Sequence, residues 1–194
     1  LLKMTQWTGK VPLIDIMCGS GTFLIEAVNQ FLEVPINLDQ FYLFENWLDF
    51  SKDIYLHEKN KAKNKIINYE KLPKIIGCEI NKKVFEQAEI NTSLAGLENY
   101  IELINNDFLE LKLEFSPGLI ICNPPYGKKL GNENELICLY EQMGIFLKNN
   151  FSGWEFWLLS GNSKLTKYLK MKSSLKFPVS NGGIDCRWIK YLIR

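Results

Sequence analysis

The sequence predicts an α/β fold of Rossmann-like architecture, with a mostly parallel sheet, helices on both of its faces and an antiparallel hairpin at the C-terminal end. Short apolar runs alternate with segments whose apolar residues recur at helical spacing, which is typical of βαβ units. A two-glycine turn separates the first apolar run from the first helix. A glycine-rich turn at 181–185 joins the last two runs and predicts a tight hairpin.

Seven strands and five helices are expected, in chain order, within one domain that covers residues 1–194. The strands are expected at residues 11–17, 74–79, 101–105, 117–122, 154–160, 175–179 and 187–193. The helices are expected at residues 22–32, 54–69, 81–96, 133–150 and 165–170, with Pro35 stopping the first. The buried side of the third helix is assigned to Val84, Phe85, Ala88 and Leu94, and that of the fourth to Leu136, Tyr140, Met143 and Leu147.

Residues 36–74 form a long connection for a compact α/β domain and are interpreted as an insertion. Its first part is aromatic and its second part is a lysine- and asparagine-rich helical segment. A solvated helix packed by a few aromatic side chains is the favoured interpretation. A platform that contacts nucleic-acid phosphates and bases is the alternative. The residues concerned are Phe41, Tyr42, Phe44, Trp47, Phe50, Lys59, Lys61, Lys63 and Lys65.

Composition excludes several classes of function. The chain of 194 residues has a net charge of +1, which argues against a nucleic-acid binder that relies on bulk charge. Its five cysteines are scattered and it has one histidine, so no metal site is expected. The scattered cysteines also predict a reducing, cytoplasmic setting. No apolar run is long enough to span a membrane. The chain begins without methionine, so we expect a fragment of a longer protein; its oligomeric state is not predicted.

The stretch from Leu13 to Thr22 is expected to fold as strand, tight turn and helix, and to hold a nucleoside. Glycine permits positive backbone torsions and lets a ligand approach the main chain closely. A carboxylate at the end of the strand can accept hydrogen bonds from an ammonium group or from loop amides. The spacing matches neither a dinucleotide fingerprint nor a Walker loop. The candidate cofactor-binding residues here are Asp15, Cys18, Gly19, Ser20, Gly21 and Thr22.

Two further acidic residues follow the next two strands. Glu79 closes the second strand and can accept both hydroxyls of a ribose, while Asp107 follows the third and can accept from an adenine amino group. Phe108 is next to Asp107 and is a candidate ring contact. In parallel sheets, ligands bind beyond the carboxyl ends of the strands, so these residues predict a nucleoside slot.

The pentad Asn123-Pro124-Pro125-Tyr126-Gly127 follows the fourth strand. Two prolines restrict the backbone and remove two N–H donors, which presents carbonyl oxygens in a fixed orientation. The side-chain oxygen of Asn123 and the carbonyl of Pro124 can then accept from one planar exocyclic amine. Tyr126 can stack on the ring that carries the amine. These four residues are the candidate catalytic residues, and Asn123 is also a candidate cofactor contact.

With both motifs in view, the chain resembles the class I S-adenosylmethionine-dependent methyltransferases with an Asn-Pro-Pro-Tyr motif. More narrowly, it is similar to the RlmL-like (UPF0020) guanine-N2 methyltransferases of ribosomal RNA. Ile16 stands where relatives usually have proline, and Glu79 where aspartate is common. The matching blocks also include Ile25-Glu26-Ala27, Asn46-Trp47-Leu48, Gly77-Cys78-Glu79, Asn181-Gly182 and Ile184-Asp185-Cys186.

The resemblance implies methyl transfer from S-adenosylmethionine to the N2 amine of a guanine in large-subunit (23S) ribosomal RNA. It also implies an RNA-binding THUMP domain upstream, and substrate contacts by Tyr126, Lys128 and Lys129. Three alternatives remain open: an adenine-N6 DNA methyltransferase, a tRNA guanine-N2 methyltransferase, and a catalytically silent RNA-binding partner.

Overall fold

The structure is a computed structural model that describes residues 1–33, 40–63, 72–113, 117–125 and 133–194. The described residues form a seven-stranded sheet in the order β3-β2-β1-β4-β5-β7-β6. Neighbouring strands from β3 to β5 are parallel, whereas β7 is antiparallel to both β5 and β6. The predicted fold class is therefore confirmed. The strands are β1 (Leu13–Asp15), β2 (Ile75–Cys78), β3 (Glu102–Ile104), β4 (Leu119–Cys122), β5 (Glu155–Ser160), β6 (Ser173–Asn181) and β7 (Ile184–Leu192).

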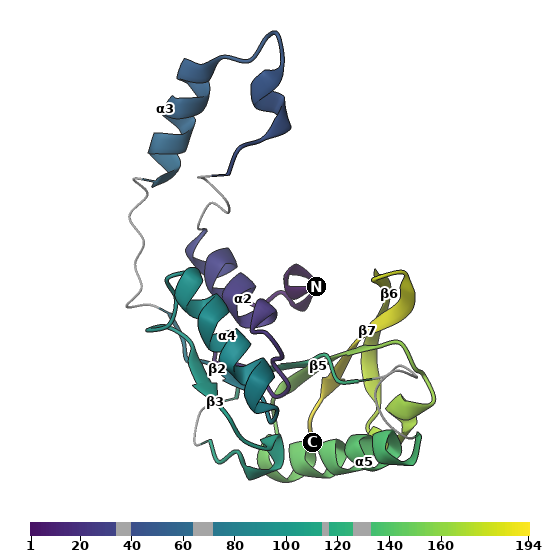
Figure 1. Cartoon of the computed structure of the whole chain (residues 1–194). Helices are drawn as coiled ribbons and strands as arrows, with labels where there is room; N and C mark the ends of the chain where they lie inside the picture. The colour runs from purple at the N-terminus through teal and green to yellow at the C-terminus, as the bar shows by residue number, and fades with distance from the viewer. Residues whose placement is uncertain (34–39, 64–71, 114–116, 126–132) are drawn as a thin grey trace.

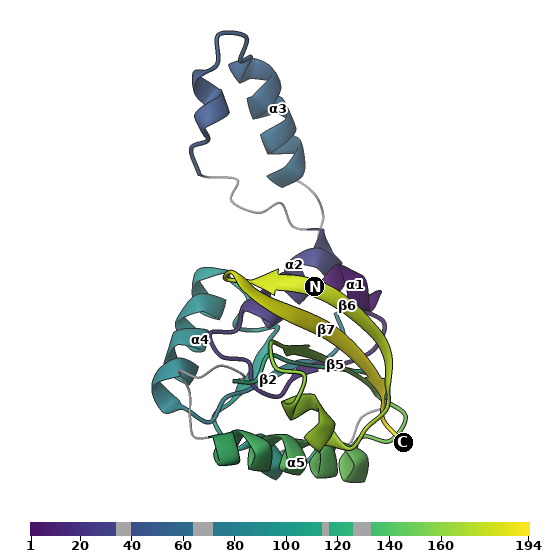
Figure 2. The ribbon, with the colours of Figure 1, turned by 90° about the vertical axis from the view of Figure 1, so that its right-hand side faces the viewer.

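Helices cover both faces of this sheet (Figures 1 and 2). Alternate residues of the central strands face opposite layers, so Ile14 packs in one apolar cluster with α5 residues and Leu13 in another with α2 residues. The predicted bounds of α2 and α5 agree with the structure, and the four predicted core residues of α5 are buried. The helical segments are α1 (Leu2–Thr5), α2 (Thr22–Leu32), η1 (Leu43–Asn46), α3 (Lys52–Lys63), α4 (Lys82–Leu94), η3 (Phe108–Glu110), α5 (Glu133–Asn150) and η4 (Leu165–Leu169).

The buried side of α4 agrees with the sequence expectation at Ala88 and differs from it elsewhere. Val84 and Leu94 are exposed, and the buried residues of this helix are Ala88 and Thr92. These two small side chains lie against Gly21, where an added Cβ would stand 3.6 Å from the Cβ of Ala88. A close approach between helix and turn requires small residues on the contact face. The larger apolar residues of α4 therefore point elsewhere.

The segment 40–63 holds η1 and α3, and Figure 1 shows it set apart from the sheet. Its aromatic rings contact one another, with Phe44 lying 5.3 Å from Tyr42 and 5.6 Å from Tyr55 between ring centroids. Trp47 is 68% exposed, and no residue of η1 is buried. The helix predicted to reach residue 69 is described only as far as Lys63; Pro35 and Lys65 lie outside the described residues. Among the helices described, none is long and apolar enough to cross a membrane.

Candidate functional site

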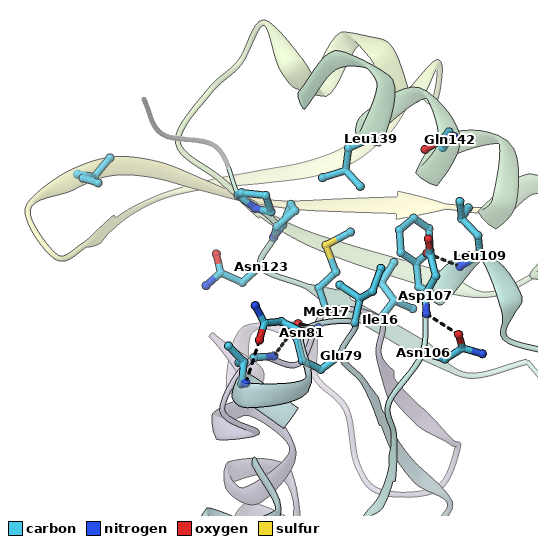
Figure 3. Close-up of a pocket in the computed structure, with 17 residues that line it drawn as sticks. Ile16, Met17, Glu79, Asn81, Asn106, Asp107, Leu109, Asn123, Leu139 and Gln142 are labelled. Carbon is cyan, nitrogen blue, oxygen red and sulfur yellow. Dashed lines mark hydrogen bonds between the residues drawn. The ribbon is translucent and has the colours of Figure 1, made fainter. Parts of the chain in front are cut away.

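A cavity of about 800 Å³ lies at the carboxyl ends of the parallel strands. Figure 3 shows Asn123 at one end of it, Asp107 at the other, and Ile16 and Met17 between them. Its volume is in the range typical of sites for small organic ligands. The lining residues are Ile16, Met17, Gly19, Glu79, Ile80, Asn81, Val84, Asn106, Asp107, Phe108, Leu109, Asn123, Pro124, Pro125, Leu139, Gln142 and Ile184.

The turn after β1 has the predicted conformation. Gly19 and Gly21 adopt positive φ values of 56° and 83°, a region that L side chains rarely enter. The Gly21 amide donates to the Cys18 carbonyl at 2.9 Å, which closes the turn. From α4, the Asn91 side chain donates to the Ser20 carbonyl at 2.9 Å. The turn is thus held on two sides.

Gly19 is the one member of the predicted glycine-turn set that lines the cavity. Asp15 and Cys18 are buried and do not line it, and Ser20, Gly21 and Thr22 also lie outside the lining. The hydroxyl groups of Ser20 and Thr22 lie 3.3 Å apart. The turn therefore presents its main chain to the cavity at a single glycine, while its other residues shape the turn.

Glu79 joins the end of β2 to the glycine turn. One carboxylate oxygen accepts from the Gly19 amide at 3.1 Å, and the other accepts from the Asn81 amide at 2.8 Å. The carboxylate is therefore fixed in orientation at the cavity wall (Figure 3). Each oxygen of a carboxylate has two lone-pair directions, so both retain a position for a ligand hydroxyl.

Asp15 precedes the lining residue Ile16 and is buried, at 1% exposure. Burial, with a smaller contribution from the charge of Glu79, raises its pKa from 3.8 to about 7, although the amide of Met17 donates to it at 3.1 Å. Burial also raises the pKa of the Cys18 thiol far above its ordinary value and that of Cys78 to about 11. Both thiols are therefore protonated near neutral pH and unreactive as nucleophiles.

The raised pKa of Asp15 predicts a pH-dependent stability. The unfolded chain releases this proton near pH 3.8 and the folded chain near pH 7, so the stabilising contribution is complete below pH 3.8 and is lost as pH rises through 7. Asp15→Asn removes this loss. We expect the difference in free energy of unfolding, Asp15→Asn minus parent, to increase by about 1–3 kcal/mol as pH rises from 5 to 8.

Urea titrations of both proteins at several pH values measure this difference. Asp185→Asn is the matched control, since Asp185 is exposed, and we expect its stability difference from the parent not to change comparably with pH. A stability difference between Asp15→Asn and the parent that stays constant with pH would contradict the assignment.

Asp107 begins η3 at the far end of the cavity. Its carboxylate accepts from the Leu109 amide at 3.0 Å, and its own amide donates to the Asn106 side chain at 2.9 Å. Phe108 is 5% exposed and its ring lies 5.4 Å from that of Phe146 on α5, so it belongs to the core as well as to the cavity lining. The predicted pair Asp107 and Phe108 thus lies in the same cavity as Glu79.

Asn123, Pro124 and Pro125 follow β4 and line the cavity together. Asn123 is exposed, whereas Pro124 is buried. The glycine turn and the proline-stiffened segment therefore open onto one cavity. Tyr126, Lys128 and Lys129 lie outside the described residues, and their predicted roles stay predictions.

Several lining residues were not found from the sequence. Ile80 and Asn81 follow Glu79 directly. The 67% exposure of Ile80 indicates a ligand contact, but exposure is not visible in the sequence. Leu139 and Gln142 come from α5, on the side opposite Glu79 (Figure 3). Ile184 begins β7, more than 60 residues after β4. Nowhere in the described ranges are three His, Cys, Asp or Glu side chains placed to hold a metal ion.

Curated relatives cover the whole chain. A putative RNA methyltransferase of Synechocystis, slr0064, is 37% identical over 192 residues, which is 98% of this chain and 50% of that protein. The ribosomal RNA large subunit methyltransferase K/L of Photobacterium profundum is 36% identical over 198 residues, 100% of this chain and 28% of that protein. The chain thus spans about half, or less, of the length of these relatives.

Solved structures share the fold. A possible methylase from Clostridium difficile has a TM-score of 0.90 at 30% identity, over all of this chain and 51% of that one. SMU.472, a putative methyltransferase solved with SAH, has a TM-score of 0.91 at 24% identity, again over all of this chain and 51% of that one. Residues 1–190 match the UPF0020 family, described as the RMKL-like methyltransferase domain. The chain belongs to this methyltransferase family.

Proposed function

We propose that this domain transfers the methyl group of S-adenosylmethionine to the N2 amine of a guanine in large-subunit (23S) ribosomal RNA. The carrying observation is that Asn123 and Pro124 line the same cavity as Gly19 and Glu79. The residues proposed to bind the cofactor and those proposed to accept from the amine thus line one cavity, although the two motifs are about a hundred residues apart in the chain.

The described residues fit the cofactor. The fixed carboxylate of Glu79 suits a ribose diol, and the carboxylate of Asp107 suits an adenine amino group. Ile80 and Val84 offer exposed apolar surface to a ring at the cavity wall. When bound, S-adenosylmethionine supplies an electrophilic methyl group on a positively charged sulfur.

Asn123 and Pro124 act on the acceptor amine in this proposal. The lone pair of a guanine amine is delocalised into its ring, which makes the nitrogen a poor nucleophile. Two oxygens that accept hydrogen bonds from its N–H groups favour a pyramidal nitrogen and the positive charge that develops on it. This stabilisation is directed at the transition state. Tyr126 would stack on the base, and Lys128 and Lys129 would contact neighbouring phosphates.

Adenine-N6 methylation of DNA is the main alternative, because the same motif suits both amines. A structural neighbour from Listeria monocytogenes, 25% identical with a TM-score of 0.85, is described as a predicted N6-adenine-specific DNA methylase. The ribosomal RNA methyltransferases related over the whole chain favour RNA instead. A tRNA guanine and a catalytically silent RNA-binding role are further alternatives.

One assay separates these candidates. The domain is incubated with labelled S-adenosylmethionine and, separately, with protein-free 23S RNA, tRNA and DNA, and the products are digested to nucleosides. We expect the label in N2-methylguanosine from 23S RNA. Label in N6-methyladenine from DNA would contradict the proposal and support the DNA methyltransferase alternative. SAH binding without methyl transfer to any of the three nucleic acids would support the catalytically silent role.

A further inference from the structure

We infer that Ile184, at the tip of the β6–β7 hairpin, forms the apolar wall against which the acceptor base packs. The inference rests on the proposed function, which requires a nucleobase as acceptor and places it beside Asn123. Ile184 is 50% exposed and lines the cavity together with Asn123, Pro124 and Pro125. Figure 3 shows the β6–β7 turn, the pale yellow ribbon, on the same side of the cavity as Asn123.

Strand register carries Ile184 beyond the body of the sheet. Arg187 pairs with Ser160, the last residue of β5, so Ile184 lies three residues past the end of that strand. At about 3.4 Å per residue, this is an overhang of roughly 10 Å. Side chains alternate along a strand, so Ile184 points to the same face of the sheet as Cys186 and Trp188, which are both buried. Ile184 therefore has β6 as a strand neighbour, through its pairing with Asn181, but no residue of β5 lies beside it.

The hairpin tip is held in place at both of its ends. Gly182 and Gly183 have φ values of 57° and 79°, as a two-residue type I′ turn requires, and Asn181 pairs directly with Ile184. Further down β7, the Trp188 ring stacks on Phe23 of α2 with centroids 5.7 Å apart. Phe23 follows the glycine turn by two residues. The hairpin is therefore anchored to the helix that begins at the cofactor side.

The two exposed isoleucines of the cavity are thereby assigned to different ligands. Ile80 follows Glu79 directly, whereas Ile184 comes from β7, which β5 separates from β4, and lines the cavity together with Asn123. A β-branched side chain has few rotamers, so its surface is well suited to selecting a planar ring by shape. Ile184 is in this view a specificity-determining residue for the acceptor, and it does not contact the methyl donor.

Ile184→Ala tests this assignment, with Leu175→Ala as the matched control on the same hairpin, since Leu175 is 47% exposed and does not line the cavity. We expect the KM for the acceptor nucleic acid to rise at least about 5-fold in Ile184→Ala, with SAH affinity by calorimetry unchanged. Leu175→Ala should change neither. An unchanged acceptor KM, or an equal loss of SAH affinity, overturns the inference.

Methyl NMR of the parent domain gives a readout that does not depend on turnover. The Ile184 signal, assigned through its absence in Ile184→Ala, should shift when guanosine or adenosine is added to the SAH-bound domain. SAH alone should shift the signal of Ile80 and leave that of Ile184 in place. A SAH-induced shift at Ile184 as large as that at Ile80 overturns the inference. A shift with adenosine alone supports it while contradicting guanine as the substrate.

Discussion

Asn123→Ala is expected to lower kcat for methyl transfer by about 100- to 1000-fold, the usual effect of removing one group that stabilises charge in a transition state. Asn123 is exposed at the end of the cavity where the acceptor is expected, so its removal leaves the core unchanged. Single-turnover transfer from labelled cofactor to RNA measures the effect. Calorimetry with SAH should show an affinity within about threefold of the parent, because the proposed function assigns the Asn123 side chain to the acceptor; a larger loss would support its role as a cofactor contact instead.

Two variants make the Asn123 result specific. Asn123→Asp retains a side-chain oxygen that can accept from the amine, so it should lose less activity than Asn123→Ala. Asn149→Ala removes an exposed asparagine at the end of α5 and should behave as the parent. Full activity in Asn123→Ala would exclude this residue from the mechanism.

Glu79→Gln is expected to weaken SAH binding by about 30- to 100-fold, corresponding to roughly 2–3 kcal/mol. The carboxylate accepts from two backbone amides, of Gly19 and of Asn81. A glutamine amide has one acceptor oxygen, and its NH₂ group would face the second N–H as donor against donor. The substitution therefore disturbs the glycine turn and removes one acceptor from the proposed ribose position.

Glu86→Gln is the control for this experiment, since Glu86 is an exposed carboxylate on α4 that does not line the cavity. Its SAH affinity should equal that of the parent. The two dissociation constants are measured by calorimetry at the same pH and salt concentration. Parent-like SAH binding by Glu79→Gln would show that the carboxylate is not part of the cofactor site.

The sequence predicted correctly those elements in which the local sequence pattern and the tertiary packing favour the same structure. The helix α2 begins after Gly21 and ends at Leu32, as its apolar periodicity indicated. The five parallel strands are shorter than expected, because the ladder pairs only part of each apolar run: β1 covers Leu13–Asp15 rather than residues 11–17. The two hairpin strands are longer than expected, since β6 covers Ser173–Asn181 and β7 covers Ile184–Leu192. Polar residues at strand ends were informative, since parallel strands bring their carboxyl ends to one edge.

The misses come from contacts between distant parts of the chain. Periodicity placed Val84 in the core, but the close approach of Ala88 to Gly21 turns Val84 to the cavity instead. Ile184 reaches the cavity only because β7 runs three residues beyond β5, and strand register is not visible in a single sequence. Leu139 and Gln142 depend in the same way on where α5 packs.

Within segment 40–63, the rings of Tyr42, Phe44, Phe50 and Tyr55 contact one another, and none of the four side chains is fully buried. A unit whose aromatic side chains are all partly exposed has a small opening free energy. Its backbone amides should therefore exchange with deuterium by local opening, long before those of β1, β4 and β5 exchange through global unfolding. Mutations that melt this unit would accordingly spare the sheet and the cavity built on it.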